Sequence, residues 1–150
     1  MHISEMDFDK LIRGSKEELN AYLKQIICPT PIASTNSEIH GYMLRLDGNG
    51  RARTNDFAAF LSNKVIDYCI PPSQIKAAKE KDAKYNTTSN TLALGRMASD
   101  LFTSLPNTGE GGELLLYLLT QNILEIPQLL CKMPLKTNTE VHYHGADGIY

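Results

Sequence analysis

The 150-residue sequence contains no tryptophan and only three cysteines. Cys28, Cys69 and Cys131 are odd in number, lie far apart and form no C-x-x-C pair. A disulfide framework or a zinc cluster is therefore not expected, and the cysteines are interpreted as reduced thiols of a cytoplasmic protein. Long apolar runs are also missing. The longest, residues 114–119, is much too short to cross a bilayer, so no membrane partner is predicted.

The sequence has no excess of one charge. Fifteen Lys and Arg residues stand against 17 Asp and Glu residues, which gives a formal net charge of -2. The chain therefore has no overall basic field that would indicate nucleic-acid binding. This is only weak evidence against such binding, because a nuclease site is itself acidic and phosphate contacts can be confined to one face. The N-terminal residues carry charges where a signal peptide would have an apolar segment. A hydrophobic content of 42% is ordinary for a soluble globular protein.

Residues 1–106 have the apolar spacing of a mainly helical region with one or two strands. Ser15 and Glu18 fit a capping box, and apolar residues at helical spacing predict a helix over residues 16–27. A short mixed run at 39–46 precedes Asp-Gly-Asn-Gly at 47–50, which predicts a strand that enters a tight turn.

Three further helices are expected in this region. The first begins at Thr54 or Asn55 and ends before Pro71. The second is the polar run 73–85, and the third covers residues 92–105 after a polar loop. The second helix carries four lysines, which are interpreted as a solvated face in preference to a set of phosphate contacts: Lys76, Lys79, Lys81 and Lys84.

A glycine-rich turn at residues 109–112 leads into an apolar helix. Glu113 falls in the first turn of this helix, where the helix dipole favours a carboxylate. At helical spacing it lies on one line with Tyr117, Thr120 and Gln121, the one polar stripe on the helix. From the pattern alone, Glu113 is either a functional carboxylate or an N-terminal charge without a further role.

Two strands are predicted after this helix, the first at residues 127–133 and the second from Val141 onwards. Alternation along the second strand puts Asp147 on the same face as Gly145, whose missing side chain leaves room for an ion or a phosphate. In an Asp-Gly pair, Asp147 can equally be a turn residue. At i, i+2 spacing, two histidines would supply half of a metal site, but no third ligand is evident: His142 and His144.

Three strings within residues 109–150 together indicate a family. They are GEGGELLLYLL, IPQLLCKMPLKT and HGADGIY, and with them the chain resembles the core of the HamA family, the nuclease component of Hachiman-type anti-phage defence. The resemblance extends back through FAAFLSNKVIDYCIPPSQI. It implies a PD-(D/E)xK restriction-endonuclease-like fold, whose metal site takes a carboxylate from a helix, an Asp from the second strand and an E-x-K from the third.

The resemblance also implies roles for particular residues. Glu113 becomes the helix carboxylate and Asp147 the strand aspartate, both as catalytic residues and as ligands of Mg2+ or Mn2+. Lys132 and Lys136 are expected to contact phosphate. The implied substrate is DNA, and the implied partner is a HamB-like helicase that restrains the nuclease.

The sequence departs from the family pattern because no E-x-K follows Asp147, and the similar EKDAK at residues 80–84 lies upstream on a predicted helix. We therefore expect one α+β domain, residues 1–150, in which a mainly helical layer at 1–106 precedes the start of a nuclease core at 107–150. The C-terminal strands of that core are expected to be missing by truncation, which would leave this chain inactive by itself. The alternatives are a naturally short, inactive paralogue that acts as a protein-interaction module, and a small-molecule enzyme that uses both histidines and Asp147.

Overall fold

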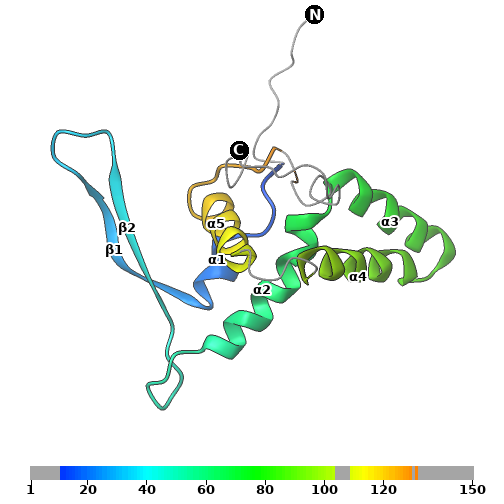
Figure 1. The fold of residues 1–150 in the computed structure, drawn as a ribbon, viewed down its shortest axis with the longest axis horizontal. Helices are drawn as coiled ribbons and strands as arrows, with labels where there is room; N and C mark the ends of the chain where they lie inside the picture. Colours follow the sequence, from blue (N-terminus) through cyan, green and yellow to red (C-terminus); the bar gives the residue numbers. More distant parts are fainter. Residues whose placement is uncertain (1–10, 104–108, 130, 132–150) are drawn as a thin grey trace, which may run out of the picture. The chain divides into compact units, whose positions relative to one another are not determined.

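The computed structural model of the chain describes residues 11–103, 109–129 and 131. This described part holds five helices and one antiparallel pair of strands (Figure 1), which confirms the predicted α+β class. In chain order the elements are α1 (Lys16–Asn20), β1 (Leu23–Pro31), β2 (Glu38–Leu44), α2 (Thr54–Cys69), α3 (Pro72–Tyr85), α4 (Ser89–Thr103) and α5 (Glu110–Asn122).

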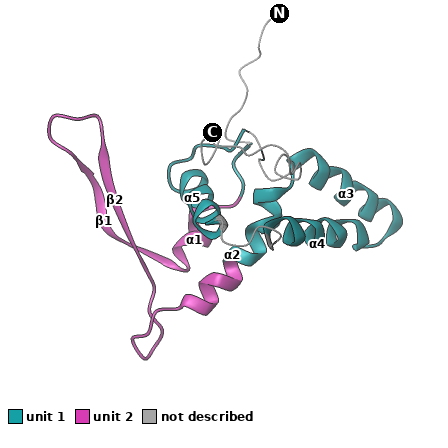
Figure 2. Cartoon of the chain, in the orientation of Figure 1, with its two compact units in different colours: residues 1–13, 61–150 teal, residues 14–60 magenta. Residues whose placement is uncertain are grey.

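The chain divides into two compact units (Figure 2). One, here called the hairpin unit, comprises residues 14–60, with α1, both strands and the start of α2. The other, here called the helical unit, comprises residues 1–13 and 61–150, and includes the rest of α2 together with α3, α4 and α5. Of the two carboxylates singled out in the sequence, Glu113 belongs to the helical unit, and Asp147 lies outside the described residues.

The hairpin unit begins with a helix much shorter than predicted. The capping box is present, since Ser15 Oγ accepts the Glu18 N–H at 3.3 Å and the Ser15 N–H donates to Glu18 Oε2 at 3.2 Å. α1 nevertheless ends at Asn20, and β1 follows where the sequence pattern predicts helix. The β-branched Ile26 and Ile27 favour extended backbone, and pairing with β2 supplies the ladder hydrogen bonds. The prediction of a helix up to residue 27 was therefore wrong.

The turn after β2 agrees with its prediction. Asp47 Oδ1 accepts the N–H of Asn49 at 2.8 Å and that of Arg51 at 2.9 Å. Gly50 adopts a φ of 76°, a left-handed conformation that glycine reaches without steric cost. β2 itself matches the predicted strand within two residues at each end. Local sequence is thus sufficient to specify this turn.

The two strands pair with Leu23 opposite Leu44 and Ile27 opposite Gly41. Ile27 packs directly over the glycine: a Cβ added at Gly41 would lie 2.7 Å from a side-chain carbon of Ile27. The register is irregular on either side of Ile27. The hairpin therefore depends on a residue without a side chain at this one position.

Aromatic rings join the residue before β1 to the first turns of α2 within the hairpin unit. The ring of Tyr22 stacks on that of Phe60 with centroids 4.6 Å apart, and lies 6.0 Å from that of Phe57. The Arg53 guanidinium lies 5.6 Å from the centroid of the Tyr22 ring. Ring pairs of this kind contribute about 0.5–1.5 kcal/mol beyond the area they bury. They hold the start of α2 to the hairpin.

In the helical unit, the predicted boundary between α2 and α3 is confirmed. α2 ends at Cys69, and Pro72 opens α3 at a position where its missing N–H costs no helical hydrogen bond. No helix in the described residues is long and apolar enough to cross a membrane. The buried apolar side chains of this unit come from all four of its helices and the residue after α2: Val65, Tyr68, Cys69, Ile70, Ala78, Ala98, Leu114, Tyr117 and Leu118.

α3 and α4 form a helical pair that one buried carboxylate ties together. Asp82 of α3 accepts the backbone N–H of Asn90 at 2.9 Å, its side-chain amide at 2.8 Å, and the N–H of Thr91 at 2.9 Å. Burial raises the pKa of Asp82, but these hydrogen bonds from Thr91 and Asn90 outweigh it and hold that pKa well below its ordinary value. Asp82 therefore caps α4 from the neighbouring helix, at N–H groups that have no partner within α4.

The chain turns back on α5 after its last residue. The N–H groups of Leu124 and Ile126 donate to the carbonyl oxygens of Leu119 and Thr120, at 3.3 and 3.1 Å. Residues 125–129 have no regular secondary structure, so the predicted strand at 127–133 is not found in its described part. The hydrogen bonds from Leu124 and Ile126 hold the chain to the end of α5 just before this stretch, and Pro127 has no N–H to donate to a strand ladder. The second predicted strand lies outside the described residues.

Candidate functional site

Glu113 lies in the first turn of α5, as the sequence predicts. Gly109 takes a φ of 57° and leads the chain into the helix. The Glu113 side chain is half-buried, and its Oε2 accepts a hydrogen bond of 2.9 Å from the hydroxyl of Tyr68 on α2. A hydrogen bond to an ionised acceptor is among the stronger ones in proteins. Tyr68 therefore fixes the direction of this carboxylate from a helix 45 residues away in the chain.

The ring of Tyr68 is itself held in place. Its centroid lies 5.3 Å from that of Tyr117 on α5, and the two rings are inclined by 55°. Tyr68 is 3% exposed and Tyr117 is fully buried. Because neither ring has room to turn away, the phenolic oxygen of Tyr68 is presented to Glu113 at a defined position.

The polar stripe predicted on α5 is buried over most of its length. Thr120 is 7% exposed and Gln121 is 1% exposed. Gln121 Oε1 accepts the backbone N–H of Arg13 at 2.7 Å. Within the part of the chain that the structure describes, Gln121 Nε2 has no hydrogen-bond acceptor. Gln121 therefore uses its buried amide oxygen to connect α5 to the backbone of Arg13.

Arg13 connects the end of α2 to α5, a contact that the sequence pattern did not reveal. Its guanidinium donates to the backbone carbonyl oxygens of Asp67 and of Ile70, the latter at 2.9 Å, where α2 ends. A cation at the C-terminus of a helix interacts favourably with the helix dipole. A lone arginine that precedes a predicted helix carries no sequence signal for a contact 54 residues away.

The same arginine contacts the thiol of Cys131, with Nη2 lying 4.0 Å from Sγ. Burial raises the pKa of the Cys131 thiol, and the positive charge of Arg13 opposes this effect without cancelling it. The thiol is therefore held in its neutral form, as expected of a structural cysteine and not of a nucleophile.

The remaining predicted site residues lie outside the described residues: Asp147, Lys132, Lys136, His142 and His144. Among the residues that are described, no group of three His, Cys, Asp or Glu side chains is arranged to hold a metal ion. Glu113 fits one ligand position for a hard divalent ion, because a carboxylate has enough lone pairs to accept the Tyr68 hydrogen bond and also bind a metal.

A family model described as HamA matches residues 19–150 of the chain. No curated protein and no solved structure matches it. The matched range includes both α2, which carries Tyr68, and α5, which carries Glu113.

Proposed function

The chain belongs to the HamA family, and from this membership we propose that it supplies carboxylate ligands to the site of a metal-dependent DNA nuclease. HamA proteins are components of Hachiman-type anti-phage defence, so the family assigns the chain to that process. The observation that supports the nuclease role is the hydrogen bond of 2.9 Å between the Tyr68 hydroxyl and the Glu113 carboxylate. It holds in one direction the residue to which this proposal assigns the role of helix carboxylate.

In this proposal Glu113 and Asp147 would hold Mg2+ or Mn2+ through their carboxylate oxygens, which hard divalent ions prefer as ligands. When bound, the ion would acidify a water molecule and offset negative charge on the scissile phosphate. Tyr68 orients Glu113 and reduces the ordering cost of metal binding. Lys132 and Lys136 would contact phosphate oxygens and offset charge that develops during hydrolysis.

The third-strand E-x-K of the family has no counterpart in residues 80–84. These residues lie within α3, and Asp82 is used to cap α4. The proposal therefore assigns to this chain the helix carboxylate and the second-strand aspartate only. A HamB-like helicase is the proposed partner, and DNA is the proposed substrate, on the basis of the family alone.

The proposal is tested by cleavage of plasmid DNA with the protein produced from its complete open reading frame, alone and with its helicase partner. We expect cleavage that requires Mg2+ or Mn2+ and is lost in Glu113→Gln and in Asp147→Asn. Asp100→Asn is the matched control, because Asp100 is an exposed carboxylate on α4. It should cleave as the unchanged protein does.

Two results would contradict the proposal. One is cleavage that persists in Glu113→Gln and Asp147→Asn. The other is a well-folded protein that cleaves no DNA with either metal in the presence of the helicase. The second result would favour the alternative in which the chain is a catalytically inactive interaction module.

A further inference from the structure

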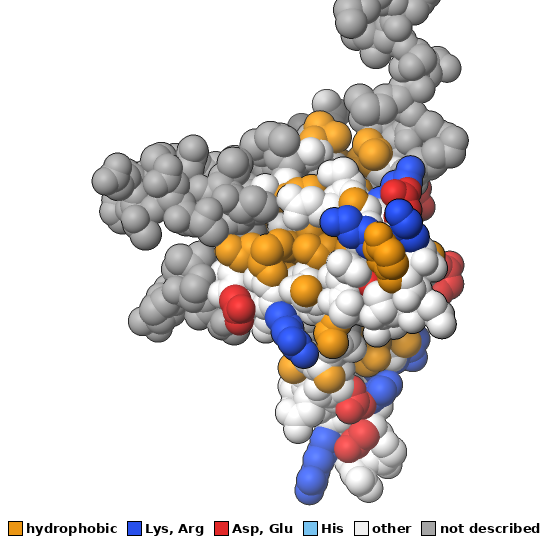
Figure 3. Space-filling view, turned by 90° about the vertical axis from the view of Figure 1, so that its right-hand side faces the viewer, with side chains coloured by type: hydrophobic (Ala, Val, Ile, Leu, Met, Phe, Trp, Pro, Cys, Tyr) orange, Lys and Arg blue, Asp and Glu red, His pale blue; other side chains and the backbone are white. Residues whose placement is uncertain are grey.

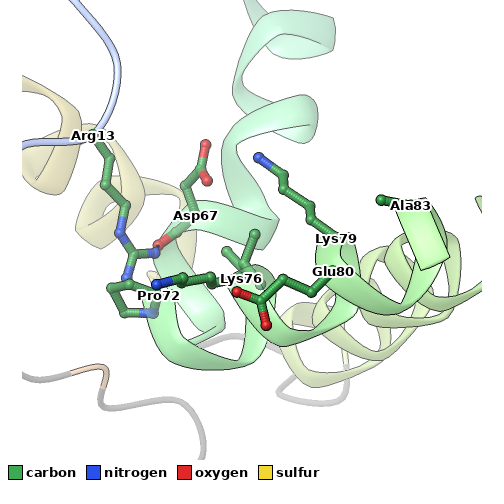
Figure 4. A pocket seen from close by; sticks show the side chains of 8 residues that line it. Arg13, Asp67, Pro72, Lys76, Lys79, Glu80 and Ala83 are labelled. Atoms are coloured by element: carbon green, nitrogen blue, oxygen red, sulfur yellow. Dashed lines mark hydrogen bonds between the residues drawn. The ribbon is translucent and has the colours of Figure 1, made fainter.

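A pocket with a volume of about 580 Å³ lies at the corner between α2 and α3 (Figure 4). Carbon atoms dominate its lining, and Pro72, Ile75 and Ala83 provide apolar side chains. The volume falls within the range of about 300–1,000 Å³ that small-molecule and cofactor sites occupy. The pocket is therefore large enough for one nucleotide.

Three cationic side chains line the pocket: Arg13, Lys76 and Lys79. The Arg13 guanidinium donates to backbone carbonyl oxygens at the end of α2, and it forms no ion pair with a carboxylate among the described residues. Figure 4 shows Lys76 and Lys79 extending from α3 on the side of the pocket where α2 and Arg13 lie. Neither lysine forms an ion pair with any residue that the structure describes. Two anionic side chains, Asp67 and Glu80, leave a local excess of one positive charge.

This excess is local. On the face seen in Figure 3, Lys and Arg side chains lie in separate groups with acidic and hydrophobic side chains among them. A duplex backbone, which presents a long convex row of phosphates, is poorly matched by one pocket with a net excess of one positive charge. A single unstacked nucleotide suits it better, because its base and sugar can contact the apolar lining while its phosphates meet the lysines.

We propose that this pocket binds one nucleotide of a single-stranded DNA segment, with Lys76 and Lys79 contacting its phosphates and the apolar lining contacting its base or sugar. The choice of DNA among nucleic acids rests on the proposed nuclease function. The pocket is separate from Glu113, so it would guide a strand and would not take part in hydrolysis.

The test is fluorescence anisotropy of a labelled single-stranded oligonucleotide in EDTA, which prevents metal-dependent cleavage. The key variant is Lys76→Gln combined with Lys79→Gln. The matched control is Lys81→Gln combined with Lys84→Gln, which removes the same charge from exposed positions of the same helix outside the pocket.

Single-strand affinity falls with salt by about 0.7 logarithmic units per phosphate contact for each tenfold rise. Loss of two phosphate contacts should therefore reduce the slope of log affinity against log salt by about 1.4. The affinity deficit of the variant relative to the unchanged protein should then be about 25-fold greater at 0.1 M salt than at 1 M salt. Ala83→Leu keeps every charge but occupies the pocket, and should weaken binding several-fold with an unchanged slope. The control pair should lose much less affinity than the pocket pair.

Equal losses in the two lysine pairs, or full binding by Ala83→Leu, would overturn the pocket as the binding site. Equal affinity for duplex and single strand would overturn the single-strand assignment. Because binding is measured without metal, it does not depend on cleavage. If the protein cleaves DNA in a Glu113-dependent way but does not bind single-stranded DNA through the pocket, only the pocket proposal is rejected. If it binds through the pocket but cleaves no DNA, only the nuclease proposal is rejected.

Discussion

The hydrogen bond from Tyr68 to Glu113 makes a quantitative prediction about the fold of the candidate site. Tyr68→Phe removes only the hydroxyl and keeps the ring that packs 5.3 Å from Tyr117. Hydrogen bonds to charged groups contribute about 1.5–3 kcal/mol, and the partial exposure of Glu113 reduces the expected loss to about 1–2 kcal/mol. For a protein of this size, that loss lowers the Tm by about 2–8 °C.

A double-mutant cycle isolates the contact. Tyr68→Phe, Glu113→Ala and the double variant are compared with the unchanged protein by urea unfolding. We expect a coupling free energy of about 1 kcal/mol, because each single change removes the same hydrogen bond. Tyr85→Phe is the control: Tyr85 is 67% exposed, so loss of its hydroxyl should change the free energy of unfolding by less than about 0.5 kcal/mol.

The cycle can refute the reasoning directly. If the effects of Tyr68→Phe and Glu113→Ala simply add, the two side chains do not interact in solution. Glu113 would then lack the orientation on which the proposed metal site depends. If the coupling is present, Tyr68→Phe should also raise the Mg2+ concentration needed for half-maximal cleavage, a change that loss of stability alone does not produce at temperatures where the variant stays folded.

Two further changes test other parts of the structure. The pKa of Asp82 is lower in the folded than in the unfolded chain, so its ionised form stabilises the fold above the unfolded pKa of about 3.9, and this stabilisation is lost as the pH falls towards the folded pKa. Thermal unfolding between pH 7 and pH 3 should show this loss, and Asp82→Asn should reduce it; an identical pH dependence would contradict the cap. Gly41→Ala forces a methyl group to within 2.7 Å of Ile27 and should destabilise the hairpin by about 1–3 kcal/mol, measured by faster amide hydrogen exchange in both strands. Gly48→Ala, which meets nothing within 4 Å, should leave exchange unchanged, and equal effects of the two would argue against the observed packing.

The sequence predicts those elements whose boundaries are set by local chemistry. The prolines at 71 and 72 separate α2 from α3, and the Asp-Gly-Asn-Gly turn follows β2, both as expected. β1 could not be predicted in the same way. Its Ile26 and Ile27 fit the end of a helical stripe as well as a strand, and the decision rests on pairing with β2, which periodicity within one segment does not report.

The candidate site shows the same limit. The position of Glu113 at the start of an apolar helix follows from the glycine-rich turn and the hydrophobic run. Its hydrogen-bond donor, Tyr68, cannot be identified from the sequence of α2, because the partner lies on another helix. The role of Asp82 was likewise not predicted, because it lies in a lysine-rich run that is interpreted as solvated. Its carboxylate is in fact buried against the start of α4.

The Asp82 cap has a consequence for the order in which the chain folds. It links residues only eight and nine positions apart, so little chain entropy is lost when the contact closes. Contacts between residues this close in the sequence form readily, whereas the hydrogen bond of Tyr68 requires a partner 45 residues away. The α3–α4 pair should therefore assemble early and serve as a nucleus. Asp82→Asn should then slow folding more than it accelerates unfolding, whereas Tyr68→Phe should chiefly accelerate unfolding.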